Sequence, residues 1–310
     1  MLTVLQTALE VGLIYGLVAL ALFISFSILN IADLSTDGCF TLGCAVGAML
    51  TIAGHPILAL FAAMAAGMLS GYVTAFLQTR LGVESILAGI ISNTGLYTIN
   101  LAVMGFSSNV SITGVDTVFS LFKGLVGGQW SRLILLALIA AVIVIVLIRF
   151  FGTSLGLSIR ATGDSLDMVS ASSINPKATI TIGLCLANAL TALSGCLIGE
   201  YNKFCDINLG TGMVTIALAS LIIGEVFAGH RGGVGKRIVC VVLGSIVYRF
   251  IIALALRLNI SAEYFKLVSA VIVAVAIAAP NMKGYVRLAK IKSNARKLRV
   301  LSGKGDETDA

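Results

Sequence analysis

The sequence predicts an all-α polytopic membrane protein with about eight to ten transmembrane helices. Its 310 residues are 58% hydrophobic and only 11% charged, and the mean hydropathy is +1.04. Soluble domains are about 45–50% apolar and about 25% charged, so a soluble chain of this composition would expose too much apolar surface to stay dispersed. A soluble globular protein is therefore excluded, and the apolar residues must be accommodated in a bilayer.

Nine apolar runs are long enough to be read as spans. A membrane-crossing helix needs about 20 residues, whereas a transmembrane β-strand needs about 10 with strict alternation, so these runs predict helices. Segments 30–41 and 81–92 are polar and glycine-rich, and half-helices or re-entrant segments are the alternative reading there. The runs are 3–29, 38–54, 57–80, 85–104, 130–150, 178–198, 212–228, 238–256 and 264–280.

The chain divides into one transmembrane domain, residues 1–280, and a basic tail, residues 281–310. The tail carries eight Lys and Arg against three Asp and Glu, which accounts for most of the net charge of +7. A basic segment next to a span is typical of the cytoplasmic side and of contact with anionic lipid, so nucleic-acid binding is not expected. Residues 283–301 fit an interfacial amphipathic helix or a solvated tail.

The placement of Lys and Arg predicts the orientation of the chain. Loops rich in these residues stay on the cytoplasmic side, which places 151–177, 229–237 and the tail inside. Segments 105–129, 199–211 and 257–263 then lie outside. We expect a multi-pass protein of a plasma membrane with a cytoplasmic C-terminus. Nine full spans would put the N-terminus outside, and half-helices would change that parity.

Small residues four positions apart recur in the predicted spans. The pairs are Gly12/Gly16, Gly43/Gly47, Gly67/Gly71 and Gly195/Gly199. Such pairs let helix backbones approach closely, either within one subunit or across a dimerisation face. The six cysteines show neither a CxxC pair nor a metal-ligand spacing, so we expect no disulfide and no metal site.

Residues 151–177 form the longest polar insertion on the predicted inner side. Arg160 to Gly163 is read as a turn, and Asp164 suits the N-cap of a short helix over about 165–174, with Asp167 in its first turn. Asn175-Pro176 then ends the helix, because the residue before proline avoids the α region. This helix is either a connector between two spans or a docking element for a cytoplasmic partner.

Three stretches of the sequence resemble one family. Gly156-Leu-Ser-Ile-Arg-Ala-Thr-Gly-Asp-Ser165, followed by Met168 and Ile174-Asn175, resembles the coupling-helix region of ABC importer permeases of the branched-chain amino acid and ribose class. Segments 28–49 and 212–227 resemble other parts of that class. The similar branch includes permeases paired with binding lipoproteins, some of them associated with aromatic amino acids. The chain departs from the family at Ser165 and Ser173, where Asn and Gly are common.

This resemblance implies a permease subunit that works with other proteins. The expected partners are a second permease subunit, two cytoplasmic ABC ATPases and an external binding protein or lipoprotein. The chain itself would be no enzyme and hold no cofactor, because ATP is used by the partner ATPase. The coupling residues that the resemblance implies are Arg160, Ala161, Thr162, Gly163, Asp164, Ser165, Leu166, Met168 and Val169.

The sequence contains no phosphate-binding loop, which agrees with ATP hydrolysis by a partner subunit. The nearest string, Gly232 to Arg237, lacks the first glycine of GxxxxGK[ST] and ends in Arg instead of Ser or Thr. The sequence therefore assigns ATP hydrolysis to a separate subunit, and the string is read as a basic loop.

A few polar residues fall within or beside the predicted spans. Asn93, Asn100 and Asn188 either form interhelical hydrogen bonds or line a substrate path. Glu225 is read as a local ion pair with the basic cluster at 230–236. Acidic residues within the spans are sparse, which argues against ion coupling. The family resemblance implies an importer of a small polar solute, with amino acids preferred. The alternatives are an ion-coupled secondary transporter and a non-transporting scaffold.

Overall fold

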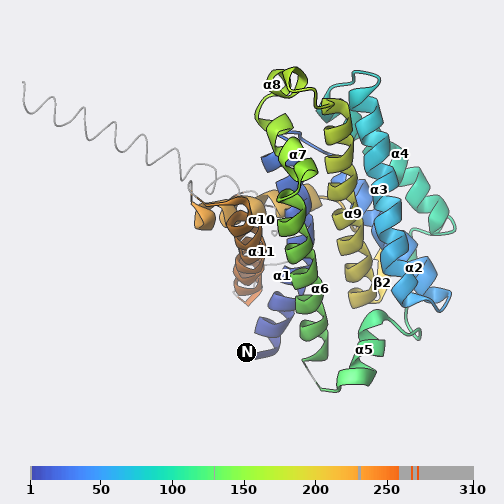
Figure 1. Cartoon of the computed structure of the whole chain (residues 1–310). Helices are drawn as coiled ribbons and strands as arrows, with labels where there is room; N and C mark the ends of the chain where they lie inside the picture. Colours follow the sequence, from blue (N-terminus) through green and yellow to red (C-terminus); the bar gives the residue numbers. More distant parts are fainter. Residues whose placement is uncertain (1, 129, 230–231, 258–266, 268–270, 272–310) are drawn as a thin grey trace, which may run out of the picture.

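The chain folds into a bundle of helices with very little sheet (Figure 1). The computed structural model describes residues 2–128, 130–229 and 232–257, with residues 267 and 271. Among these residues, six apolar helices are long enough to cross a bilayer and two are shorter. The six are α1 (Leu2–Leu22), continued by the π-helical turn η1 (Phe23–Ile28), α3 (Pro56–Thr79), α4 (Ser85–Val103), α6 (Ser131–Phe151), α9 (Pro176–Asn202) and α11 (Val234–Arg257).

The two shorter apolar helices are α2 (Thr36–Ile52) and α10 (Met213–Ala228). Together, these eight helices coincide with eight of the nine predicted runs, so the prediction of an all-α polytopic membrane protein is confirmed. The ninth run, 264–280, and the tail, 281–310, lie outside the described residues.

The remaining elements mark the two ends of the bundle. Helices α7 (Ser154–Asp164) and α8 (Leu166–Ala171) lie at one end, named here the α8 end (Figure 1). Helix α5 (Val118–Val126) lies at the opposite end, named here the α5 end. Strand β1 (Asn109–Ser111) follows α4 and pairs antiparallel with β2 (Phe204–Asp206), which follows α9. The loops after α4 and after α9 are therefore joined at the same end.

Helix α9 lies at the centre of the bundle and packs against α1, α2 and α3. Glycine makes these contacts close. A Cβ atom on Gly43 would lie 1.9 Å from the carbonyl oxygen of Ala192, and one on Gly195 would lie 1.9 Å from that of Phe40. The other predicted pairs pack in the same way, and Gly12 and Gly16 contact α11. The small residues thus serve helix packing within one subunit.

Helix α2 spans only half of the bundle. Residues 29–35 lack helical structure, and Asp33 in this segment contacts Asn188, which lies halfway along α9. At the other end of α2, the Thr51 hydroxyl donates to Glu200, near the end of α9. The second span is therefore broken near mid-depth, and the half-helix reading near 30–41 is correct.

Helix α10 begins at the same depth and runs the other way. The backbone N–H groups of Gly212 and Val214 donate to Asp37, in the first turn of α2, whereas Glu225 contacts Ser27 of η1 at the α8 end. The predicted bounds are wrong here, because 199–211 is not a single loop and α10 is a half-helix instead of a full span. The external location predicted for the turn between α9 and α10 stays a prediction. Helix α9 continues to Asn202, and residues 207–212 return into the bundle before α10 begins.

The second segment with a half-helix alternative, 81–92, is an ordinary helical hairpin. Residues 81–84 form the turn between α3 and α4, with Gly82 at a φ of +69°, and α4 then continues unbroken from Ser85 to Val103.

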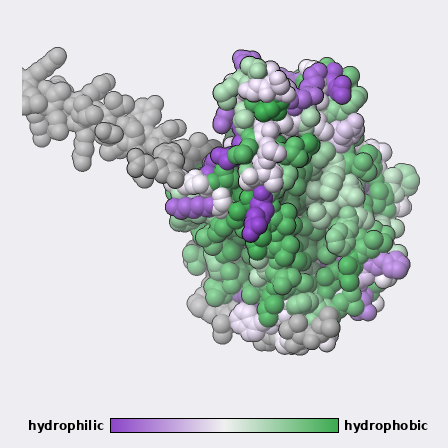
Figure 2. All heavy atoms as spheres, in the orientation of Figure 1, coloured by the Kyte–Doolittle hydropathy of each residue, from purple (hydrophilic) through white to green (hydrophobic). Residues whose placement is uncertain are grey.

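The surface between the two ends is largely hydrophobic. Figure 2 shows this apolar band on the visible face, with hydrophilic residues concentrated towards the α8 end. Helix α6 contributes exposed Leu138, Val142 and Ile145, each more than half exposed. Side chains of this kind are stable in contact with lipid and not with water. The chain is therefore a multi-pass membrane protein.

Candidate functional site

A buried polar cluster holds the break in the second span. Asp33 is 3% exposed, and its carboxylate accepts from the backbone N–H of Ser35 at 2.9 Å, from the Ser35 hydroxyl at 2.6 Å and from the side-chain amide of Asn188 at 2.8 Å. A buried carboxylate is tolerated only when donors surround it. These three bonds therefore fix the non-helical segment against the middle of α9.

Asp37 performs a similar function for α10. Its two carboxylate oxygens accept from the N–H groups of Gly212 and Val214, each at 2.9 Å. A helix N-terminus carries partial positive charge and free N–H groups, so a carboxylate there stabilises it. One half-helix thus begins beside Asp33 and the other begins on Asp37. In transporters, discontinuous helices that end near mid-depth commonly form the substrate region.

The three predicted asparagines lie around the start of α2. Asn188 donates to Asp33, and the side-chain amide of Asn100 donates to the carbonyl oxygen of Gly38 at 3.0 Å. Both are 1% exposed. Asn93 is half-buried, and a Cβ on Gly38 would lie 2.6 Å from its Oδ1. Asn100 and Asn188 tie helices together in this conformation, and a role in lining the path stays a prediction.

The predicted coupling segment is helical over a longer stretch than expected. Arg160, Ala161, Thr162, Gly163 and Asp164 belong to α7, so the predicted turn at 160–163 is wrong. The N-cap of the next helix is Ser165, whose hydroxyl accepts from the Met168 N–H at 3.4 Å, and not Asp164.

The following helix, α8, is also shorter than predicted. It ends at Ala171, and Asn175 begins α9 instead of ending α8, because its side chain accepts from the Lys177 N–H at 3.0 Å. A serine hydroxyl caps a helix as well as a carboxylate does, which is why the cap could not be placed from sequence.

Helix α7 is packed tightly onto the bundle. A Cβ on Gly163 would lie 1.7 Å from the carbonyl oxygen of Ile28, so glycine is needed there for close approach to the end of η1 and not for a turn. The hydroxyl groups of Thr162 and Thr179 are 2.8 Å apart, which ties α7 to the first turn of α9. Any force on α7 is therefore transmitted to η1 and α9.

Helix α8 presents two different sides. Val169 is 1% exposed and anchors the helix to the bundle, whereas Leu166 and Met168 are 53% and 56% exposed. Large apolar side chains at a polar end of a protein commonly mark a surface that a partner covers. Of the predicted coupling residues, Asp164, Leu166 and Met168 are exposed, and the last two are apolar.

An ion pair joins α10 and α11 close to this end. The Arg237 guanidinium donates to Glu225 at 2.6 Å and to the hydroxyl of Ser27 at 2.6 Å, and it lies 5.1 Å from the centroid of the Phe23 ring. The predicted ion pair of Glu225 is present, but its partner is Arg237 in the first turn of α11. His230 and Arg231 lie outside the described residues.

Sequence reasoning missed three charged residues inside the bundle, of which Glu10 and Glu200 are buried and Arg249 is partly buried. Glu10 accepts from Gln6 and from the Tyr201 hydroxyl, and Glu200 accepts from Thr51 and from the Val118 N–H at 2.8 Å. The Arg249 guanidinium lies 3.8 Å from the centroid of the Tyr15 ring. Each of these residues is a single charge in an apolar run, and that isolation was the available signal.

The sequence of this chain matches a known family of membrane transport proteins. Residues 4–277 match the family model described as the permease component of branched-chain amino acid transport systems. The chain belongs to this permease family. The match covers all the helices described above, including the broken spans and the α7–α8 segment. The resemblance seen in the sequence is confirmed, and the chain is a permease component of a transport system.

Two relatives extend the comparison over nearly the whole chain. The permease is 32% identical over 272 residues to a tyrosine transport system permease protein of Clostridioides difficile (strain R20291), covering 87% of this chain and 89% of that protein. It is 31% identical over 277 residues to an uncharacterized protein of Rickettsia prowazekii (strain Madrid E), covering 88% and 96%. No solved structure matches the chain.

Proposed function

We propose that this permease is the membrane-spanning subunit of an ATP-driven importer for an amino acid. The observation that carries the proposal is the α7–α8 segment. It is anchored to the bundle through Thr162 and Val169 while Leu166 and Met168 stay exposed. A short, firmly anchored helix with an apolar outer side suits a cytoplasmic ATPase that pushes on the bundle through it.

The ATPase is proposed to be a separate subunit. A phosphate-binding loop connects a strand to a helix, whereas the sequence Gly232 to Arg237 follows helix α10 and runs into the first turn of α11. Arg237 is engaged by Glu225 and Ser27. The chain is proposed to use no cofactor of its own.

The orientation proposed for the permease puts the α8 end in the cytoplasm of a prokaryotic cell. Cationic side chains are more numerous at that end among the described residues, which agrees with the positive-inside rule. The α8 end has Arg80, Arg149, Arg160, Lys177, Lys236 and Arg237, and the α5 end has Lys123, Arg132 and Lys203. The tail, 281–310, is proposed to be cytoplasmic as well.

The proposed assembly contains two permease subunits, two ATPases and an external binding protein or lipoprotein that docks at the α5 end. Helices α2 and α10 begin near mid-depth, where transporters commonly hold their substrate, and this supports transport over a scaffold role. The relative in Clostridioides difficile is named for tyrosine transport. Aromatic amino acids are therefore the first substrates to test.

The test is uptake by proteoliposomes that contain the permease, its ATPase and its binding protein. Labelled tyrosine is supplied with the binding protein on the α5 side, and ATP is supplied on the α8 side. We expect uptake only with ATP and with all components present, and no ATP hydrolysis by the permease alone. Uptake by the permease alone under a proton or sodium gradient would instead show a secondary transporter. Ligand screening of the binding protein identifies the substrate.

A further inference from the structure

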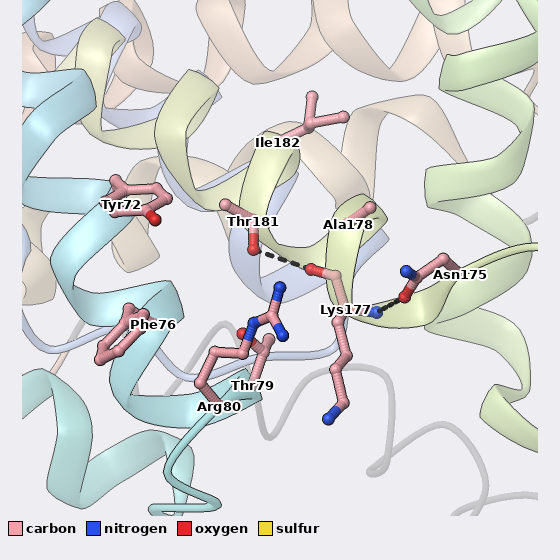
Figure 3. A pocket seen from close by; sticks show the side chains of 9 residues that line it. All are labelled: Tyr72, Phe76, Thr79, Arg80, Asn175, Lys177, Ala178, Thr181 and Ile182. Carbon is pink, nitrogen blue, oxygen red and sulfur yellow. Dashed lines mark hydrogen bonds between the residues drawn. The ribbon is translucent and has the colours of Figure 1, made fainter.

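A groove lies between the end of α3 and the start of α9, at the α8 end (Figure 3). Its volume is about 310 Å³, at the lower end of the range of ligand pockets. None of its lining residues belongs to the α7–α8 segment or to the buried cluster around Asp33. The lining residues are Tyr72, Phe76, Thr79, Arg80, Asn175, Lys177, Ala178, Thr181 and Ile182.

The groove changes from apolar to polar along its length. Along α3 it passes from Tyr72 and Phe76 to Arg80, and along the antiparallel α9 it passes from Ile182 to Lys177. The aromatic side chains lie on the side towards the middle of the bundle, and the two cations lie towards its end. Tyr72 and Arg80 are eight positions apart, or about 12 Å along a helix, which is enough to reach from the headgroup region of about 5–8 Å per leaflet into the acyl chains.

Two cationic side chains at the polar end lack partners. Within the described part of the chain, neither Arg80 nor Lys177 forms an ion pair or a side-chain hydrogen bond. In Figure 3 the Arg80 guanidinium extends into the space between the two helices, towards Thr181 and the backbone of Lys177. The hydroxyl of Thr181 donates to the Lys177 carbonyl oxygen at 2.7 Å, and as a neutral group it does not balance the charge of the two cations.

The groove opens onto the surface that faces lipid. Tyr72 and Phe76 are 53% and 43% exposed, and the neighbouring Leu69 and Val73 on α3 are also exposed. Tyrosine is enriched where a protein crosses the membrane interface. An occupant must therefore be amphiphilic, with an apolar part against α3 and an anionic part against Arg80 and Lys177.

We propose that this groove binds an anionic phospholipid. The lipid phosphate lies between the Arg80 guanidinium and the Lys177 ammonium. The part of an acyl chain nearest to the headgroup lies along Tyr72, Phe76 and Ile182. Basic pockets between transmembrane helices select anionic headgroups because each nearby cation contributes to binding. A zwitterionic lipid gains less, since its own ammonium group is repelled by the same two side chains. The site requires only that the chain spans a bilayer and does not depend on ATP coupling.

Native mass spectrometry of the full-length purified permease tests this site. Phosphatidylglycerol and phosphatidylcholine with the same acyl chains are added in turn, and the lipid retained is measured. We expect preferential retention of phosphatidylglycerol. Arg80→Gln and Lys177→Gln should each weaken it about five-fold, and the double variant should weaken it roughly 25-fold. The matched control is Lys123→Gln with Lys203→Gln, which removes two exposed cations at the α5 end.

Each remaining outcome decides the question. Equal retention of the two lipids, an unchanged double variant, or an equal loss in the control would overturn the proposal. Competition by inorganic phosphate as effective as that by phosphatidylglycerol would show a site for a free anion. If the double variant retains the lipid but loses its ATPase in a pull-down, the groove is a protein contact. Thermal unfolding of every variant excludes loss of folding as the cause.

Discussion

The side-chain amide of Asn188 donates a 2.8 Å hydrogen bond to the carboxylate of Asp33, and both residues are almost fully buried. The bond joins the centre of α9 to the interruption of the second span. Because Asp37 lies four residues further along and caps α10, the same short segment positions both half-helices. A local change at Asn188 should therefore alter the stability of the whole centre of the bundle.

Replacing Asn188 with Ala should destabilise the permease. Asp33 would keep its two bonds from Ser35 but lose its interhelical donor, and such a loss at a buried charged acceptor costs about 1–3 kcal/mol. The midpoint of thermal unfolding in detergent measures the effect. The control is Asn208→Ala, which changes an exposed asparagine and should change stability by less than about 0.5 kcal/mol. Equal shifts for the two variants would contradict this account.

Much of the fold could be predicted from the sequence. Runs of apolar residues long enough to cross a bilayer permit little besides a helix, so eight helices were located within a few residues. A break near the start of α2 was also indicated, because residues 30–41 are polar and glycine-rich. The return of 207–212 into the bundle was not predicted. The segment is held by the Asp37 carboxylate of α2, which accepts from the Gly212 N–H. The sequence does not reveal this contact, because the two residues are far apart along the chain.

The candidate site was predicted only in part. The coupling residues were located through resemblance, but the cap and the turn were misplaced because Asp164 and Ser165 are both good N-caps. Gly163 was read as a turn residue, whereas it is needed for contact with the Ile28 carbonyl oxygen. The two readings of a glycine, turn or close approach, differ only in the neighbour that it meets, and that neighbour is distant in sequence.

Substitution of Gly43 should separate the effect of packing from that of helix propensity. Gly43→Ala places a Cβ 1.9 Å from the Ala192 carbonyl oxygen, so α2 and α9 must move apart, at a cost of about 1–3 kcal/mol. Gly95→Ala in α4 meets nothing within 4 Å and should stabilise the permease by about 0.5–1 kcal/mol. Both are measured by thermal unfolding. If the two variants shift in the same direction, close packing at Gly43 is not limiting.

The proposed orientation predicts which sites react with an impermeant maleimide outside intact cells. In a cysteine-free background, Thr113→Cys after β1 should be labelled, because the α5 end is proposed to face outwards. Ser170→Cys in α8 should be labelled only after the membrane is permeabilised. Both positions are exposed, so access to the side chain does not distinguish them. Labelling of position 170 in intact cells would reverse the orientation.

The ion pair of Glu225 and Arg237 should give a modest, salt-dependent coupling energy. Both side chains are about one-third exposed, and partly exposed pairs contribute about 0.5–1 kcal/mol. A double-mutant cycle with Glu225→Gln and Arg237→Gln isolates this term, and it should decrease as the salt concentration rises. Strictly additive single variants would show that the pair does not hold α10 and α11 together.

The exposed side of α8 should determine attachment of the ATPase. Leu166→Ser with Met168→Ser removes two apolar side chains that are each more than half exposed, so folding of the permease should be unaffected. A partner that buries them loses about 1.5–3 kcal/mol for each side chain. We therefore expect loss of the ATPase from a pull-down, and loss of ATP-dependent uptake in the reconstituted complex.

Val169→Ala provides the comparison, because it changes the anchored side of the same helix. Val169 is 1% exposed, so its truncation should loosen α8 and weaken coupling while Leu166 and Met168 remain available. The ATPase should then still bind, but each ATP hydrolysed should drive less uptake. A Leu166 and Met168 double variant that assembles, hydrolyses ATP and transports like the wild type would show that α8 is only a connector. The proposal of ATP coupling would then lose the structural observation that carries it.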